Sequence, residues 1–156
     1  MLHTISYILL NGFGGSVWLY LAARVATGAF FVLSGYHKLT NANRRATFVA
    51  TLQACGVPFI PVMQWLVPSV EFLGGLGVAF GFLTPLAALG LVVICLVAIY
   101  TDGIRRINGW GAIDRADVID DFLYLPEVLY VVLLALFIGS GAGPVSLDAL
   151  LLTHFL

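Results

Sequence analysis

Three charged side chains lie inside long apolar stretches of this 156-residue chain: Arg24, Glu71 and Glu127. A charge at the centre of a bilayer costs roughly 2.5–3.5 kcal/mol on insertion scales, so such groups face the interior of a helix bundle and pair there. A buried carboxylate can bind a ligand or move a proton. The alternative is that a buried pair only fixes which helix packs against which.

Depth within the apolar stretches predicts the partners of these charges. At a helical rise of about 1.5 Å per residue, Arg24 lies roughly 10 Å and Glu71 roughly 16 Å from the same membrane face. An arginine side chain spans that difference, so we expect Arg24 and Glu71 to pair, directly or through water. Glu127 lies about 9 Å from the opposite face, where His37 and Lys38 are its expected partners. These five residues are the candidate buried polar or ligand-binding residues.

The composition indicates an integral membrane protein. Hydrophobic residues make up 61% of the chain and charged residues 10%, against about 45–50% and about 25% in soluble domains. With a net charge of −1, the chain has no basic surface for nucleic acid, and its expected environment is the lipid bilayer. Cys55 and Cys95 are far apart and form no C-x-x-C motif, so no metal site is predicted.

We expect an all-α fold, an integral membrane four-helix bundle with short interfacial helices, in a single domain over residues 1–156. A membrane-spanning helix needs about 20 apolar residues. The predicted spans are about 17–37, 62–82, 85–101 and 121–139.

Capping residues predict where further helices begin. A short helix between the first two spans is capped by Asn41 or Asn43, and a tail helix by Ser146. Thr84 is the expected N-cap of the third span, with Pro85 at its first position.

Small residues predict where the spans approach closely. Gly28 and Gly35 are seven residues apart and share a face of the first span. Gly77 and Gly81 form a G-x-x-x-G motif in the second, after two further glycines. Small residues at this spacing let helices approach closely in membranes.

Lysine and arginine in the short loops predict the orientation. They follow the first and third spans, so loops 38–61 and 102–120 are expected in the cytoplasm and both termini outside. This corresponds to a multi-pass protein of a bacterial-type inner membrane. The residues concerned are Lys38, Arg44, Arg45, Arg105, Arg106 and Arg115.

A fusion tests the orientation. Alkaline phosphatase joined to the C-terminus should be active, because that enzyme folds only outside the cytoplasm. An inactive fusion that is stably produced would reverse the assignment.

Three motifs in the same order and spacing resemble the DoxX family. RVATGAFFVLSGYHKL at 24–39 has an arginine, spaced glycines and Lys-Leu. ACGVPFIPVMQWLVPSVEFLGGLGVAFGFLTPLAALGL at 54–91 has Gly-Val-Pro, Glu-x-x-Gly-Gly and Leu-Thr-Pro. PEVLYVVLLALFIGSGAGPVSLDALL at 126–151 has a glutamate and Gly-Pro-x-Ser-Leu-Asp. The resemblance covers about 20 to 151.

The resemblance implies a four-helix membrane bundle whose recurring polar positions are Arg24, Lys38, Glu71 and Glu127. Some DoxX relatives are subunits of a thiosulfate:quinone oxidoreductase, and others associate with redox or detoxification partners. The long charged loop at 102–121 departs from the family pattern. It is either a docking surface for a partner or a solvated connection, and its alternating charges favour the second.

The function expected first is that of a membrane subunit of a quinone-linked oxidoreductase. The chain carries no flavin, haem or iron–sulfur signature, so a quinone is the candidate ligand and a protein partner brings the electrons. The alternative is a non-enzymatic scaffold or assembly partner, with a homo-oligomer also open. A small-solute transporter ranks last, because small multidrug exporters place a glutamate in the first span, where this chain has Arg24.

Overall fold

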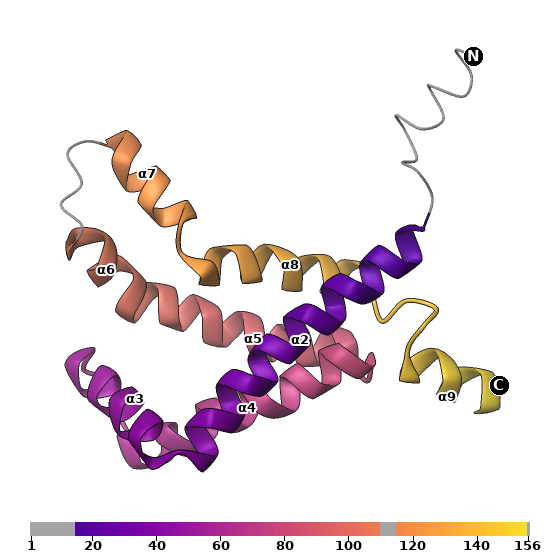
Figure 1. The fold of residues 1–156 in the computed structure, drawn as a ribbon, viewed down its shortest axis with the longest axis horizontal. Helices are drawn as coiled ribbons and strands as arrows, with labels where there is room; N and C mark the ends of the chain where they lie inside the picture. The colour runs from indigo at the N-terminus through magenta and orange to yellow at the C-terminus, as the bar shows by residue number, and fades with distance from the viewer. Residues whose placement is uncertain (1–14, 110–114, 156) are drawn as a thin grey trace.

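The computed structural model describes residues 15–109 and 115–155, and their backbone is helical with no strand. The predicted all-α class is therefore confirmed. The elements (Figure 1) are α2 (Ser16–Thr40), α3 (Ala42–Ala54), α4 (Ile60–Phe80), α5 (Thr84–Ala98), the π-helical turn η1 (Ile99–Gly103), α6 (Ile104–Gly109), α7 (Arg115–Leu123), α8 (Pro126–Ser140) and α9 (Leu147–Phe155).

Three continuous helical segments of the described chain are long and apolar enough to cross a membrane: Ser16–Thr40, Ile60–Phe80 and Thr84–Ile107. The chain is thus an all-α integral membrane protein, and its first two predicted spans are confirmed. The third is longer than the predicted 85–101, because α5 continues through η1 into α6. The start of the expected 102–120 loop is therefore helical.

The expected fourth span, 121–139, is not one straight helix. It consists of Asp117–Leu123 and Pro126–Ser140, which are bent by 59° at a short break. Pro126 causes the break, because it has no N–H to donate and disfavours a helical conformation in the residue before it. Leu125 is extended accordingly, with φ −68° and ψ 121°. Glu127 consequently lies in the first turn of α8, directly after the break, rather than in the middle of a continuous helix.

Two of the predicted caps are confirmed. The Asn41 side chain accepts hydrogen bonds from the backbone N–H groups of Asn43 and Arg44 at the start of α3. Ser146 Oγ accepts the backbone N–H of Ala149, at 3.1 Å, at the start of α9.

The predicted cap of the third span is wrong. Leu83, with φ 47°, occupies the N-cap of α5, and Thr84 is its first helical residue. The Thr84 hydroxyl is fully buried and, among the described residues, has no hydrogen-bond partner. Asp148 in α9 accepts the Leu83 N–H instead, at 3.0 Å. A residue distant in the sequence therefore supplies the cap, which local spacing could not reveal.

The closest helix contact joins α2 to α4 through glycines. A Cβ on Gly28 would lie 2.6 Å from the carbonyl oxygen of Gly75, and one on Gly35 would lie 2.6 Å from that of Pro68. The predicted glycine face of the first span is thus confirmed. Its partner is the face of α4 that carries Pro68, Glu71 and Gly75, whereas Gly77 faces α5.

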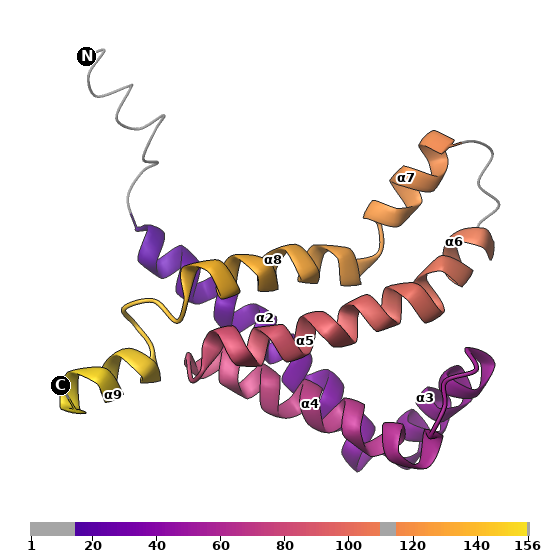
Figure 2. The ribbon, with the colours of Figure 1, turned by 180° about the vertical axis from the view of Figure 1, so that it is seen from behind.

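The remaining helices build outward from this contact. α5 packs against both α4 and α8, and a buried core runs between α2, α4, α5 and α8. At one end of the molecule, α3 lies apart from α6 and α7, so the helices diverge beyond the core (Figures 1 and 2). The expected position of the N-terminus concerns residues outside the described range.

Gly35→Ala should destabilise the bundle. Its methyl group would meet backbone atoms of α4 that cannot rotate away, and overpacking of this kind costs about 1–3 kcal/mol. The thermal midpoint in detergent should fall by several degrees. The matched control is Gly90→Ala, where the nearest atom is a side-chain carbon at an ordinary 3.5 Å. Equal midpoints for the two variants would contradict the glycine contact.

Candidate functional site

An ion pair between a partly buried lysine and a buried glutamate joins α2 to α4. Lys38 Nζ lies 2.7 Å from both carboxylate oxygens of Glu71, and Ser34 Oγ donates to Oε2 at 3.1 Å. Ser34 and Lys38 are one helical turn apart, on either side of Gly35. Because Gly35 brings the α4 backbone into contact, both side chains reach Glu71, which is 6% exposed.

A second ion pair joins α6 to α8. Arg106 Nη2 lies 2.7 Å from Glu127 Oε1, and Arg106 Nε lies 3.0 Å from Asp102 Oδ2. Glu127 Oε2 is buried and, among the described residues, accepts no hydrogen bond. A buried oxygen without a donor is costly, so this carboxylate is the less completely satisfied of the two.

Cys95 of α5 lies near both pairs. Its side chain is 3% exposed, and it lies within electrostatic range of Glu71, Glu127 and Lys38. Charged and thiol groups from α2, α4, α5, α6 and α8 thus lie within electrostatic range of Cys95 or are paired with a group that does. We call this group the polar cluster: Ser34, Lys38, Glu71, Cys95, Arg106 and Glu127. Within the described residues, no group of histidines, cysteines and carboxylates could hold a metal ion.

The expected pair between Arg24 and Glu71 is not present. Arg24 donates from Nη1 to the carbonyl of Ala142 and from Nη2 to that of Val145, the latter at 2.7 Å. Side chains in a helix lean toward its N-terminus, which turns Arg24 away from Glu71. The segment after α8 offers the carbonyls that accept its protons, and Lys38 takes the place expected for Arg24.

The partners expected for Glu127 were also wrong. His37 is exposed and its ring contacts that of Tyr36, while Lys38 pairs with Glu71. Arg106 pairs with Glu127 because α5 extends into α6 and α8 begins at Pro126. The sequence did carry a signal for this: Ile104 and Ile107 continue the apolar spacing of the third span beyond residue 101.

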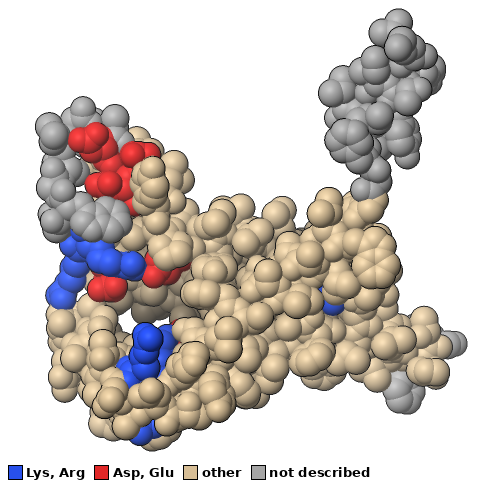
Figure 3. Space-filling view, in the orientation of Figure 1, with Lys and Arg blue, Asp and Glu red and all other residues tan. Residues whose placement is uncertain are grey.

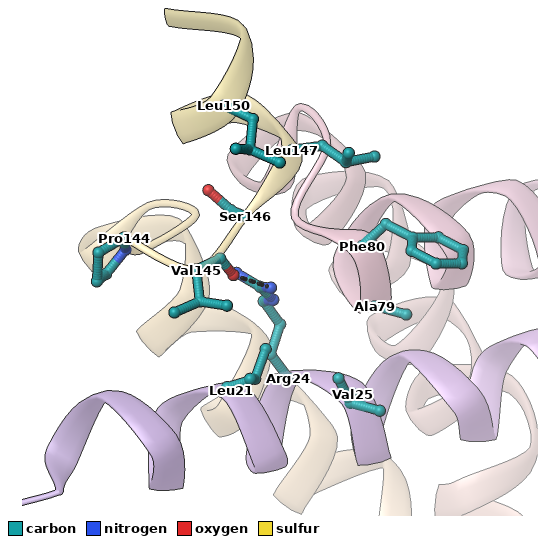
Figure 4. Close-up of a pocket in the computed structure, with 10 residues that line it drawn as sticks. All are labelled: Leu21, Arg24, Val25, Ala79, Phe80, Pro144, Val145, Ser146, Leu147 and Leu150. Carbon is teal, nitrogen blue, oxygen red and sulfur yellow. Dashed lines mark hydrogen bonds between the residues drawn. The ribbon is translucent and has the colours of Figure 1, made fainter. Parts of the chain in front are cut away.

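Arg24 lies at the opposite end of the bundle from the polar cluster. Its side chain is 2% exposed and lines an apolar groove of ≈ 460 Å³ between α2, the end of α4 and the segment leading into α9 (Figure 4). We call this the Arg24 groove. It is lined by Leu21, Arg24, Val25, Ala79, Phe80, Pro144, Val145, Ser146, Leu147 and Leu150.

These features define an integral membrane protein with buried ion pairs between its helices. The DoxX family model matches residues 19–102, a little over half of the chain, and the chain therefore belongs to the DoxX family. The matched region includes Arg24, Lys38 and Glu71, while Glu127 lies beyond it. No curated protein and no solved structure matches the chain.

Lys38 and Glu71 should be energetically coupled, whereas Arg24 and Glu71 should not. Removing one partner of a buried ion pair typically costs about 3–5 kcal/mol, and replacing both often costs little. Thermal unfolding in detergent should show Lys38→Met as strongly destabilising and Lys38→Met with Glu71→Leu as largely restored.

The comparison cycle uses Arg24→Met with Glu71→Leu, whose effects should add, because the two residues share no contact. Additive effects in the first cycle, or coupling in the second, would contradict the assignment of these partners.

Proposed function

We propose that the chain is the quinone-binding membrane subunit of an oxidoreductase, with the polar cluster as its proton-exchanging site. The observation that carries the proposal is the buried Lys38–Glu71 pair, joined by both carboxylate oxygens at 2.7 Å. Buried ionisable residues in membrane helices commonly mark ligand or proton pathways. Membership of the DoxX family supports the redox context.

The residues around this pair fit a quinone head group. The Lys38 side chain is 23% exposed, so part of it can be reached from outside the bundle. Lys38 Nζ lies 5.0 Å from the centroid of the Phe48 ring, which offers aromatic surface beside the pair. The surface is hollowed at this end of the molecule, with basic and acidic side chains around the hollow (Figure 3).

The chemistry of the side chains favours the polar cluster over Arg24 as the redox site. A bound quinone supplies electron transfer accompanied by proton transfer. Glu71 offers a carboxylate, the kind of group that acts in proton transfer, and Lys38 beside it can donate a hydrogen bond to a carbonyl oxygen. Arg24 keeps its proton under all ordinary conditions and so cannot exchange one. Glu127 is the second carboxylate available within the cluster.

Electrons would come from a protein partner that carries its own redox cofactor. The α6–α7 region is the part of the described chain best placed to meet it, because α7 extends away from the bundle core (Figure 1). The same observation favours the second candidate, a non-enzymatic scaffold. Between α6 and α7 lies an apolar groove of ≈ 370 Å³, lined by Ile104, Ile107, Val118, Ile119, Phe122 and Leu123.

Purification from native membranes in mild detergent tests the proposal. Wild-type protein should retain quinone, measured by extraction and chromatography. Lys38→Gln and Glu71→Gln should retain about ten-fold less, the factor that corresponds to about 1.4 kcal/mol, a single charged hydrogen bond. Mass spectrometry of the same sample identifies the co-purifying proteins.

The matched control is Arg44→Gln, which removes an exposed cation from α3 and should leave the quinone content unchanged. Wild-type protein without quinone but with a specific protein partner would support the scaffold instead. Equal quinone in wild type, Lys38→Gln and Glu71→Gln would place the quinone elsewhere and contradict the site.

A further inference from the structure

Arg24 is a buried cation that forms no ion pair within the part of the chain that the structure describes. In residues 15–109 and 115–155, no carboxylate forms an ion pair with it. Asp148 lies within electrostatic range but makes no ion pair with Arg24, and its Oδ1 accepts the N–H of Leu83. The two hydrogen-bond partners of Arg24 are neutral carbonyls, so no anion contacts its charge directly within the described residues. Such a charge in a membrane protein is costly.

The guanidinium group also keeps unused donors. It has five N–H bonds, of which Nη1 and Nη2 each use one on a carbonyl of the segment after α8. Nε is buried and, among the described residues, has no hydrogen-bond partner. The planar guanidinium group of Arg24 therefore has a positive charge and unused N–H donors. Guanidinium groups with this geometry bind phosphate oxygens well.

The groove beside Arg24 is open to the bilayer. Three of its lining residues on separate elements are exposed in the monomer: Val25 (44%) on α2, Phe80 (61%) on α4 and Leu150 (59%) on α9. Figure 4 shows Arg24 rising from α2 between the α4 end and the Val145 segment, with these apolar side chains around it. The Arg24 groove thus combines one cationic group with an apolar lining.

The depth of Arg24 matches that of a lipid head group. α2 has 25 residues, or about 37 Å, against a hydrocarbon thickness of about 30 Å. If it is centred, the Arg24 backbone lies about 9 Å below the hydrocarbon surface. Its side chain leans toward the helix N-terminus and carries the guanidinium toward the head-group level, as snorkelling arginines do.

We propose that Arg24 and its groove bind an anionic phospholipid, with the phosphate on the guanidinium group and an acyl chain along the apolar lining. The lipid supplies a negative charge in direct contact with Arg24, and its phosphate oxygens accept N–H bonds of the guanidinium group that the two carbonyls leave unused. A zwitterionic lipid would bring a cationic head group toward Arg24 and is disfavoured. This site is separate from the polar cluster and does not depend on the quinone proposal.

Native mass spectrometry of the detergent-purified protein tests the site. Wild-type protein should carry a bound anionic phospholipid. After delipidation, titration with dihexanoyl phosphatidylglycerol should raise the thermal midpoint, and Arg24→Gln should weaken its apparent affinity about ten-fold or more, because a charged hydrogen-bonded contact is lost. Arg44→Gln, an exposed cation at the other end, should bind as wild type does.

Because Arg24→Gln also removes two bonds to the segment after α8, a second variant keeps the test decisive. Val25→Trp fills the groove and retains Arg24, and it should weaken phosphatidylglycerol binding as well. Parallel titrations use dihexanoyl phosphatidylcholine, decanoate and a short-chain quinone. A stronger response to any of these three, or unchanged phosphatidylglycerol binding in both variants, would overturn the proposal.

Discussion

Backbone meets backbone where α2 crosses α4, because Gly28, Gly35 and Gly75 carry no side chain there. This contact sets the positions of both polar regions. It places Lys38 opposite Glu71 at one end and brings Arg24 beside Gly81, where α4 terminates, at the other. Larger residues would separate the helices and leave a buried carboxylate without its cation. The glycines are therefore required for Lys38 to reach Glu71 across the helix contact.

The two polar regions satisfy their charges in different ways. In the polar cluster each carboxylate has a cation from a neighbouring helix, so charge is balanced within the protein. Arg24 instead lies near the C-terminal end of α8, where helix carbonyls carry partial negative charge. That end stabilises a cation without neutralising it. Under the two proposals made above, the polar cluster exchanges protons and Arg24 holds an anion, which would separate the two kinds of chemistry along the length of the bundle.

Much of the fold was predictable from the sequence, but the pairing of the charges was not. Apolar length predicted the helices, and local spacing predicted the caps at Asn41 and Ser146. Depth along a helix predicted that Arg24 and Glu71 would be buried, because depth follows from counting residues. Their partners depend on the direction of each side chain and on a segment more than a hundred residues away, which counting does not provide. The proline at position 126 is a local signal for the helix break, but the apolar stretch continues on both sides of it and therefore predicted one continuous span.

The π-helical turn at Ile99–Gly103 explains why Arg106 belongs to the polar cluster. Such a turn accommodates one extra residue, and π-turns are frequent at functional sites. One residue corresponds to about 100° of rotation in an α-helix, so a regular helix here would turn Arg106 away from Glu127. Glu127 would then be a half-buried carboxylate with neither oxygen paired. The irregular turn and the break before α8 both occur at this end of the bundle, and both are needed to bring a cation from α6 to a carboxylate on α8.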